Sequence, residues 1–353
     1  MTAEYPHVTV ILNKTPKQNG NGQAGKVAMI GAFKTTETNP VLFGTLAEAV
    51  ASFGDDDSFD GCVCLPYIFR GATSVLAVNI TTWSSATPPV ATKTITSENL
   101  AAALAKIKGE DWDILFVAGI LTDTFLPIID EFLDDCYEIK YPAGFVGGLG
   151  GGTTSANVTS AGKAGTHCYG LTTQGFMLDG STTASSVLIS SAYLCGLIAG
   201  MPVGNTLTMK NVNGVSGVSP ELSFETGGDG KTLLQAGIMT FKCADRNSGR
   251  YICVNSEQPN GYDLYVNRVR DYVVKEMSLH QFLGERNRET TLSEIKQEIS
   301  RVRDNCVNTL DLLKDIEYEV IKKSSSCVDI HIKRLLFDGL ITEINVYVSV
   351  EVE

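Results

Sequence analysis

The two ends of the chain carry β-type patterns that stand apart from the rest. Near the C-terminus apolar and polar residues alternate strictly, and the apolar set is Ile344, Val346, Val348, Val350 and Val352. Successive side chains of a strand point to opposite faces, so this alternation predicts a strand with one buried face. An unpaired strand would leave backbone N–H and C=O groups without partners, and we therefore expect it to join another sheet.

A second β-type run lies near the N-terminus, over residues 8–12, and includes Val8, Val10 and Leu12. Residues 13–25 follow it and are mostly polar, with three glycines and one proline. Such a composition is typical of a flexible linker. We predict an arm with its linker over residues 1–25 and a C-terminal arm over residues 340–353.

Between the arms, buried-strand patterns alternate with helical ones. This alternation indicates βαβ units and a largely parallel sheet. Thr45 and Glu48 have the spacing of a capping box, which fixes where the first helix begins. A helix over residues 185–200 ends this first domain, which we place at residues 26–200. The other predicted strands are 26–33, 74–80 and 114–118, and the other helices are 46–53, 98–108 and 126–136.

The composition shifts after residue 200, and we place a second domain at residues 201–339. Gly237 follows a predicted helix end, as expected of a C′ glycine. Thr291 and Glu294 again have capping-box spacing and predict the start of a late helix. The fold class is thus mixed α/β (α+β), with two domains and extended N- and C-terminal β-arms. The expected elements are a Gly- and Ser-rich connector over 215–230, paired strands at 239–243 and 250–255, helices at 263–283, 291–308 and 309–315, and a strand at 328–333.

Residues 144–157 are rich in glycine and admit two interpretations. A phosphate-binding loop of the Walker type needs a Gly-Lys-Ser/Thr ending, but the first lysine after the run is Lys163. The glycines also lead into Thr, Ser and Asn, which are poor helix starters in a run. We interpret the segment as a flexible surface loop, and the alternative is a nucleotide-binding α/β enzyme.

Net charge narrows the choice of partners. The chain carries 40 acidic and 28 basic residues, a formal net charge of −12. A negative surface repels phosphate backbones and anionic lipids, so we expect no nucleic acid partner and no membrane insertion. The N-terminus shows no secretory signal, and the apolar stretch 187–203 is too short and interrupted to span a membrane. We expect the protein to be made in the cytoplasm.

The reactive side chains form no recognisable catalytic set. Nine cysteines, an odd number, argue against a disulfide framework. Cys62 and Cys64 are expected on one face of a strand, without the other ligands of a metal site. His167 beside Cys168 is the one candidate thiol–imidazole pair, but adjacent strand residues point to opposite faces. Asp55, Asp56 and Asp57 lack the spacing of an EF-hand loop. We therefore expect no enzyme, metal or cofactor.

Several segments together carry a family resemblance. They are residues 25–31 with Leu46-Ala47-Glu48-Ala49 and Phe53-Gly54; Phe69-Arg70-Gly71-Ala72 with residues 75–78; Ala199-Gly200-Met201-Pro202 with Asn205, Leu207, Thr208 and 212–215; and Leu233 with Ala236-Gly237-Ile238-Met239-Thr240. In this order and spacing the chain resembles the contractile tail sheath proteins of phages, tailocins and related injection systems. At 353 residues it is short for that family. The glycine-rich segment matches no family pattern.

The resemblance implies a structural subunit that polymerises helically around an inner tube and contracts to drive the tube through a target envelope. It also implies that the arms containing Val8–Leu12 and Ile344–Val352 add strands to sheets of adjacent copies. Expected partners are other copies, the tube protein, and baseplate and tail-terminator proteins, within an assembled tail or injection particle. A rival is a non-contractile binding module whose terminal strand pairs within its own fold.

The second domain is then expected to face the tube. Charge pairs that solvent screens suit a surface that must grip and release, and the charged residues around the helix at 291–308 are our candidates. Their alternative role is a plain solvated surface. The candidates for tube contact are Glu285, Arg286, Arg288, Glu289, Glu294 and Arg301.

Overall fold

The computed structural model describes residues 25–338, apart from residues 140, 151, 245–248, 278, 283–284 and 325–326. Both predicted arms therefore lie outside the described residues. The strand predictions for 8–12 and 344–352 stay predictions.

A six-stranded sheet forms the centre of the main domain. Its strand order is β2-β3-β1-β6-β7-β8, and all neighbours run parallel except the edge strand β2, which is antiparallel to β3. The strands are β1 (Lys26–Gly31), β2 (Val41–Phe43), β3 (Ser74–Asn79), β6 (Ile114–Leu121), β7 (Gly144–Leu149) and β8 (Cys168–Thr172). The expectation of a mixed α/β fold with a largely parallel sheet is confirmed.

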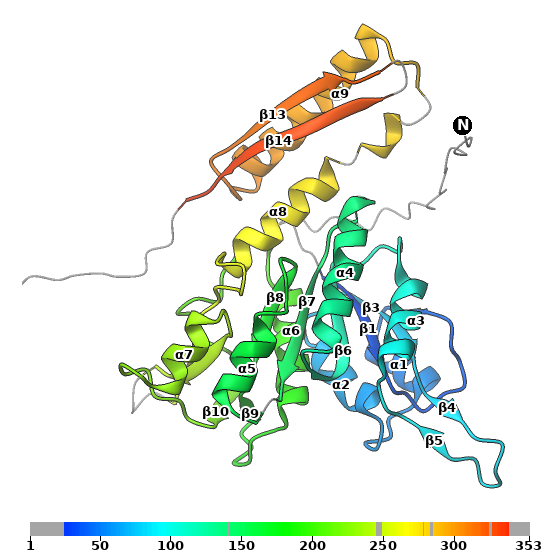
Figure 1. The fold of residues 1–353 in the computed structure, drawn as a ribbon, viewed down its shortest axis with the longest axis vertical. Helices are drawn as coiled ribbons and strands as arrows, with labels where there is room; N and C mark the ends of the chain where they lie inside the picture. The colour runs from blue at the N-terminus through cyan, green and yellow to red at the C-terminus, as the bar shows by residue number, and fades with distance from the viewer. Residues whose placement is uncertain are drawn as a thin grey trace, which may run out of the picture.

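Helices cover both faces of this sheet (Figure 1). On one face α6 packs against α2 and against β6, β7 and β8, while α3 and α4 pack together on the other face. The helices are α1 (Leu46–Phe53), α2 (Asp60–Ile68), α3 (Ser97–Ile107), α4 (Phe125–Glu138), α5 (Thr154–Ala161) and α6 (Val187–Gly200). The capping box of Thr45 and Glu48 is present, so the start of α1 is as predicted.

Two local predictions in this domain are wrong. Cys62 and Cys64 lie in the buried helix α2 rather than on a strand. Most of the glycine-rich segment is not a surface loop: residues 144–149 form the buried strand β7, and α5 begins at Thr154, with Thr153 as its N-cap accepting from the backbone N–H of Ala156. Only the residues between β7 and α5, among them the exposed Gly150 and Gly152, fit the loop prediction. A Cβ at Gly147 would meet Leu121. The glycines of β7 are explained by tight packing inside the sheet. The nucleotide-binding alternative gains no support.

Three short antiparallel pairs surround the sheet. The pairing of β11 with β12 and the position of Gly237 after α7, at a φ of +72°, are as predicted. The pair β9–β10 was not expected, and β10 lies inside the predicted connector. The elements are β4 (Thr82–Trp83), β5 (Ala91–Thr92), β9 (Gly175–Leu178), β10 (Val215–Ser219), α7 (Asp229–Gln235), β11 (Thr240–Cys243) and β12 (Tyr251–Asn255).

A smaller C-terminal lobe stands above the main domain and is joined to it by α8 (Figure 1). It consists of a two-stranded antiparallel sheet packed against a helix. Its elements are η1 (His280–Phe282), α9 (Glu289–Asp304), the π-helix η2 (Asn305–Thr309), β13 (Asp315–Lys322) and β14 (Val328–Leu336), and α8 is Leu264–Glu276.

The hydrophobic clusters divide the molecule at α8. The larger cluster takes in residues from Val27 to Leu264, and the smaller one is built from Val203, the later residues of α8 and the lobe. Most of residues 201–262 thus pack with the main domain, although the sequence suggested a boundary after Gly200.

Three predicted elements of this region are wrong in their bounds or type. The helix expected to continue to residue 283 ends at Glu276. Helix α9 begins at Glu289, two residues before Thr291, and its N-cap residue makes no side-chain cap hydrogen bond. The segment predicted as a short helix at 309–315 instead leads into β13.

Candidate assembly surfaces

The charged residues proposed for tube contact are all exposed to solvent. Three lie in the segment before α9 and three on α9 itself: Glu285, Arg286, Arg288, Glu289, Glu294 and Arg301. The opposite stripe of α9 is apolar and buried in the lobe. Amphipathicity therefore places Glu289, Glu294 and Arg301 on the outer side of α9.

Of these six residues, Arg301 has the best-defined partner. Its Nε lies 2.9 Å from Oε2 of Glu298, and its Nη2 lies 2.5 Å from Oε1. This hydrogen bonding lowers the pKa of the Glu298 carboxyl. Because Arg301 is 62% exposed, solvent screens the pair and it adds little to stability. The pair can exchange for other partners at small cost.

The β13–β14 sheet presents a charged side and two edges. Lys333 Nζ lies 2.6 Å from Glu319 Oε2, and Arg334 pairs with Glu317 at 3.9 Å. Tyr318 packs toward the lobe core on the other side. Among the described residues each of the two strands pairs only with the other, so each leaves one edge without a strand partner. Such edges are templates for added strands.

A charge cluster ties α8 to the main domain. Lys275 Nζ lies 2.8 Å from Asp111 Oδ1 and 3.0 Å from Asp113 Oδ1, and Lys26 also pairs with Asp111. Burial opposes the ammonium, but the two carboxylates outweigh burial and raise the pKa of Lys275. The lobe is thereby held to the sheet by specific charges as well as by packing.

A second polar group lies at the middle of α8. The hydroxyl of Tyr169 donates to Asp271 Oδ2 at 2.8 Å, and Arg270 Nε lies 2.7 Å from Asp271 Oδ1. Arg268 is 2% exposed and donates to the carbonyl oxygens of Met201 and Pro202 at 2.9 and 3.1 Å. Burial lowers the pKa of Arg268 to about 10. Buried charges require such partners, so α8 has one defined position on the sheet.

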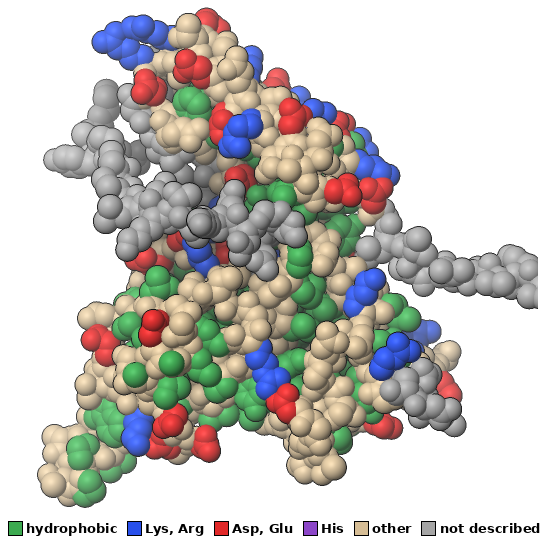
Figure 2. Space-filling model, turned by 180° about the vertical axis from the view of Figure 1, so that it is seen from behind, with side chains coloured by type: hydrophobic (Ala, Val, Ile, Leu, Met, Phe, Trp, Pro, Cys, Tyr) green, Lys and Arg blue, Asp and Glu red, His purple; other side chains and the backbone are tan. Residues whose placement is uncertain are grey.

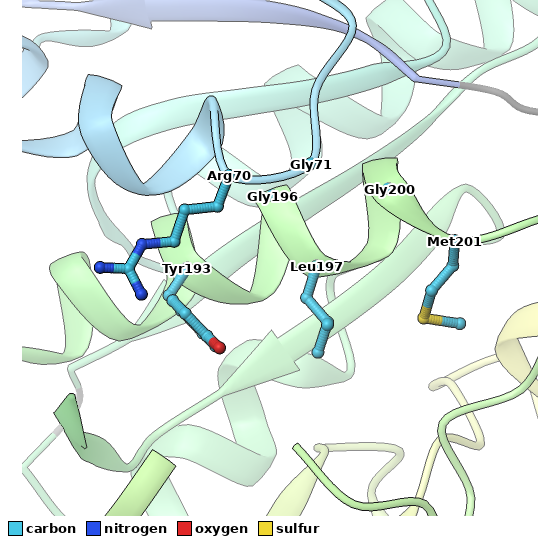
Figure 3. Close-up of a pocket in the computed structure, with 7 residues that line it drawn as sticks. All are labelled: Arg70, Gly71, Tyr193, Gly196, Leu197, Gly200 and Met201. Atoms are coloured by element: carbon cyan, nitrogen blue, oxygen red, sulfur yellow. The ribbon is translucent and has the colours of Figure 1, made fainter. Parts of the chain in front are cut away.

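The cavity in Figure 3 lies where α2 and α6 meet. It has a volume of about 240 Å³, with glycines on one side and Arg70, Tyr193, Leu197 and Met201 as its side chains. The guanidinium of Arg70 lies 5.2 Å from the Tyr67 ring and 5.3 Å from the Tyr193 ring, and its Nη1 lies 3.0 Å from Asp179 Oδ1. Arg70 is thus occupied by contacts within the chain.

His167 and Cys168, the candidate thiol–imidazole pair, contact different residues and not each other. His167 Nε2 lies 3.0 Å from Asp134 Oδ1, whereas Cys168 Sγ donates to Gln258. Burial raises the pKa of the Cys168 thiol, so it is a poor nucleophile. Within the described ranges, no three His, Cys, Asp or Glu side chains gather as metal ligands.

In the part of the chain that the structure describes, every helix is too short or too polar to cross a bilayer.

Sequence reasoning missed the charge clusters along α8. Lys275 and Asp111 are 164 positions apart, and no local pattern links them. The β13 strand, in contrast, carries a local signal: Ile316, Tyr318 and Val320 alternate with acidic residues. Period-two alternation of this kind predicts a strand with one buried face.

The chain resembles known proteins in its fold but not in its sequence. The sequence matches no protein-family model and no curated protein. The fold, however, matches a sheath tail protein from Desulfitobacterium hafniense with a TM-score of 0.64 at 12% identity, over 89% of this chain and 93% of that one. It matches a sheath tail protein from Listeria innocua with a TM-score of 0.61 at 11% identity, over 88% and 95%.

A third match is to a chain of the anti-feeding prophage helical sheath in its contracted state. It has a TM-score of 0.65 at 13% identity and covers 98% of this chain and 99% of that one. This chain has the fold of the contractile tail sheath proteins.

The matches include chains from more than one part of an assembled particle. A chain of the anti-feeding prophage baseplate also matches, with a TM-score of 0.66 over 99% of this chain and 100% of that one. The matched prophage chains come from assembled particles, a helical sheath and a baseplate. At identities of 11–13% the likeness concerns the backbone, so the side-chain contacts described here are particular to this chain.

Proposed function

We propose that this chain is a structural subunit of a contractile tail sheath. It polymerises helically around an inner tube and contracts to drive the tube through a target envelope. The observation that carries this proposal is the match to the contracted prophage sheath over 98% of this chain. The chain acts as a structural component rather than as an enzyme. The particle is a phage tail, a tailocin or another injection system, made in a host cytoplasm.

Copies are joined by exchanged strands. The arms with Val8, Val10 and Leu12 and with Ile344 to Val352 are the donors, and the β13–β14 sheet is the acceptor. Two observations support this assignment: the alternation at the C-terminus, and the two edges of β13–β14 without a described strand partner. Main-chain hydrogen bonds supply affinity in such β-augmentation, and alternate side chains set the register.

The chain leaves the lobe at a defined point. Tyr265 OH donates to the carbonyl oxygen of Asp338 at 2.7 Å, and its ring meets Phe337 edge-on at 5.7 Å. Asp338, the last described residue before the predicted arm, thus lies next to the start of α8. Linkers at residues 13–25 and around Gly339 let subunits rotate while strands stay paired, which contraction requires.

The lobe contacts the tube through exposed charges. Glu285, Arg286, Arg288, Glu289, Glu294 and Arg301 are the proposed contacts, and their exposure supports this role. Other partners are baseplate and tail-terminator proteins at the sheath ends. Screened pairs such as Arg301–Glu298 rearrange at little cost, which suits a contact that must be released.

Deletion of residues 340–353 tests the proposal. The purified full-length chain is expected to form tubes visible by electron microscopy, whereas the deletion variant stays folded, soluble and monomeric. Circular dichroism and light scattering separate these states. Unfolding of the deletion variant would show that the strand belongs to its own core. Tubes formed by that variant would refute strand donation.

A further inference from the structure

The β4–β5 hairpin is a protrusion that carries no charge. It projects from the main domain at the end opposite α7 and the start of α8 (Figure 1), and its tip shows only apolar and neutral surface (Figure 2). No residue from Gly71 to Thr92 is charged, although 19% of the chain is. Val90 is 63% exposed and Trp83 36%. Cores of protein interfaces are depleted in charge, and this tip shares that property.

The hairpin is held in place from its base. The indole N–H of Trp83 donates to the carbonyl oxygen of Thr35 at 3.0 Å, and its ring lies 6.1 Å from that of Phe59. Nearer the tip, the backbone N–H of Ser84 donates to Val90 and that of Val90 donates to Ser84 Oγ, both at 2.9 Å. A protrusion ordered before binding loses little entropy on docking.

A cavity of about 360 Å³ lies at the other end of the main domain, between the end of α7 and the start of α8. Its apolar wall is formed by Met209, Leu234 and Val254. Met209 is 56% exposed and Tyr262, next to the cavity, is 57% exposed. The hairpin and this cavity together hold three of the seven large apolar side chains that the described residues expose, and Tyr262 beside the cavity is a fourth.

Backbone strain holds Met209 in this position. Its φ is +56°, a conformation that non-glycine residues rarely adopt. Its N–H donates to the carbonyl oxygen of Cys253 at 2.8 Å, which fixes the strained turn. Strain that keeps an apolar side chain in water costs stability, and such sites are often functional.

The polar groups of the cavity favour an uncharged occupant. Asp263 Oδ2 accepts from the hydroxyls of Thr206, Thr208 and Ser256 at 3.1, 2.8 and 2.7 Å, so this carboxylate needs no cation from a ligand. Glu257 adds a second negative charge to the lining. An acidic segment would be repelled here, whereas the hairpin tip brings no charge and buries apolar surface.

We propose that the β4–β5 tip of one subunit docks into the Met209 cavity of a second copy of this chain. Because tip and cavity lie at opposite ends of the domain, the contact is heterologous and repeats without closing on a dimer. The proposal rests on the sheath function and adds to it a second contact between subunits, made by rigid surfaces rather than by arms.

Photo-crosslinking tests the contact directly. A benzophenone amino acid replaces Val90, the variant is mixed with isotopically labelled wild-type chain, and crosslinks between chains are mapped by mass spectrometry. Crosslinks are expected on peptides containing Met209 and Tyr262. The same probe at Ile139, which is 39% exposed, is the control and should not reach those peptides. Absence of crosslinks between chains, or crosslinks to other regions, would overturn the proposal.

A substitution series separates this contact from the sheath function itself. Val90→Asp is expected to raise the concentration needed for tube formation by about tenfold or more, and Ile139→Asp to leave it unchanged. Adding Met209→Lys to Val90→Asp should restore assembly. If wild type and Val90→Asp form tubes equally well, the proposed contact between hairpin and cavity is refuted, whereas the proposed sheath function is not. If wild type forms no tubes, the sheath function fails, and the crosslinks in solution still decide the contact.

Discussion

At the scale of single residues, Lys275 joins the two parts of the molecule. It comes from α8, while Asp111 and Asp113 precede β6. Burial would raise the pKa of Asp111, but Lys275 and Lys26 outweigh burial and lower it. Both partners thus keep their charges because the other is present. The position of the lobe depends on this mutual compensation.

Lys275→Met should therefore destabilise the chain. The substitution leaves Asp111 and Asp113 without their shared cation, and removing one partner of a partly buried pair costs about 2 kcal/mol once solvent screening is allowed for. Urea unfolding at pH 7 measures the change. Lys34→Met is the matched control: Lys34 is 54% exposed in its pair with Asp56, so a change within about 0.5 kcal/mol is expected. Equal losses for both variants would contradict this account.

The same pair predicts a pH dependence. A carboxyl whose pKa is lower in the folded state adds stability above its unfolded pKa, about 3.9 for Asp, and loses it as pH falls through the folded pKa. The pKa of Asp111 is lowered, so the difference between wild type and Lys275→Met should be constant from pH 6 to 8 and shrink below about pH 4. Urea titrations across this range measure it. A difference that persists unchanged at pH 3 would exclude the charge pair as its cause.

At the scale of elements, predictions from the sequence were correct where residues within one helix or its caps determine the local structure. The capping box of α1 and the C′ glycine of α7 are of this kind. Predictions failed where residues distant in the sequence determine which residue fits. The glycines of β7 look like a loop in sequence, but a Cβ at Gly144 would meet the Tyr169 ring and one at Gly148 would meet Val187. Tertiary packing selects glycine there, and a single sequence does not reveal which neighbours are present.

Packing of α2 against α6 gives an element-scale prediction. A Cβ at Gly196 would clash with the carbonyl oxygen of Tyr67, which is backbone and cannot turn aside. Gly196→Ala should destabilise by about 1–3 kcal/mol despite the better helix propensity of alanine. Thermal unfolding measures the loss.

Gly162→Ala is the matched control for this substitution. Gly162 has a φ of −62°, and the nearest atom to a new Cβ would be Thr159 O at 3.5 Å. The free energy of unfolding of this variant should stay the same or rise by about 0.5 kcal/mol. If Gly196→Ala proves as harmless as Gly162→Ala, the close approach of the two helices is not a constraint.

The segment before α9 gives a further prediction. Arg286→Glu with Arg288→Glu reverses two exposed charges without touching the lobe core. If these residues grip the tube, the variant should polymerise alone like wild type but fail to coat tubes of the inner protein. Co-sedimentation and electron microscopy with and without tube protein measure both. Lys163→Glu, at an exposed site on the main domain, is the control. If the double variant coats tubes normally, Arg286 and Arg288 do not contribute to the contact with the tube.

At the scale of the whole molecule, the two hydrophobic clusters explain both the success and the limit of sequence reasoning. The order of strands and helices follows from hydrophobic periodicity, so the fold class could be predicted. The division at α8 could not, because residues 201–262 look like a new domain by composition but bury their apolar side chains against the main domain.

Strand donation makes a prediction about mixtures of subunits. A subunit lacking residues 340–353 keeps the β13–β14 acceptor but has no C-terminal strand to give. In a heterologous array such a subunit can join one end of a growing tube and leaves the next site unfilled. Small fractions of it, mixed with wild type, should therefore shorten tubes progressively.

Tube lengths measured by electron microscopy at several mixing ratios test this chain-terminating effect. The control is the full chain with Ser349→Ala, which changes the polar side of the predicted strand and should leave lengths unaltered. If the truncated chain is left out of the tubes and lengths do not change, the β13–β14 edges are not sufficient for recruitment. Shortening would instead show that accepting and donating strands are separable properties of one subunit, as a polar, open-ended assembly requires.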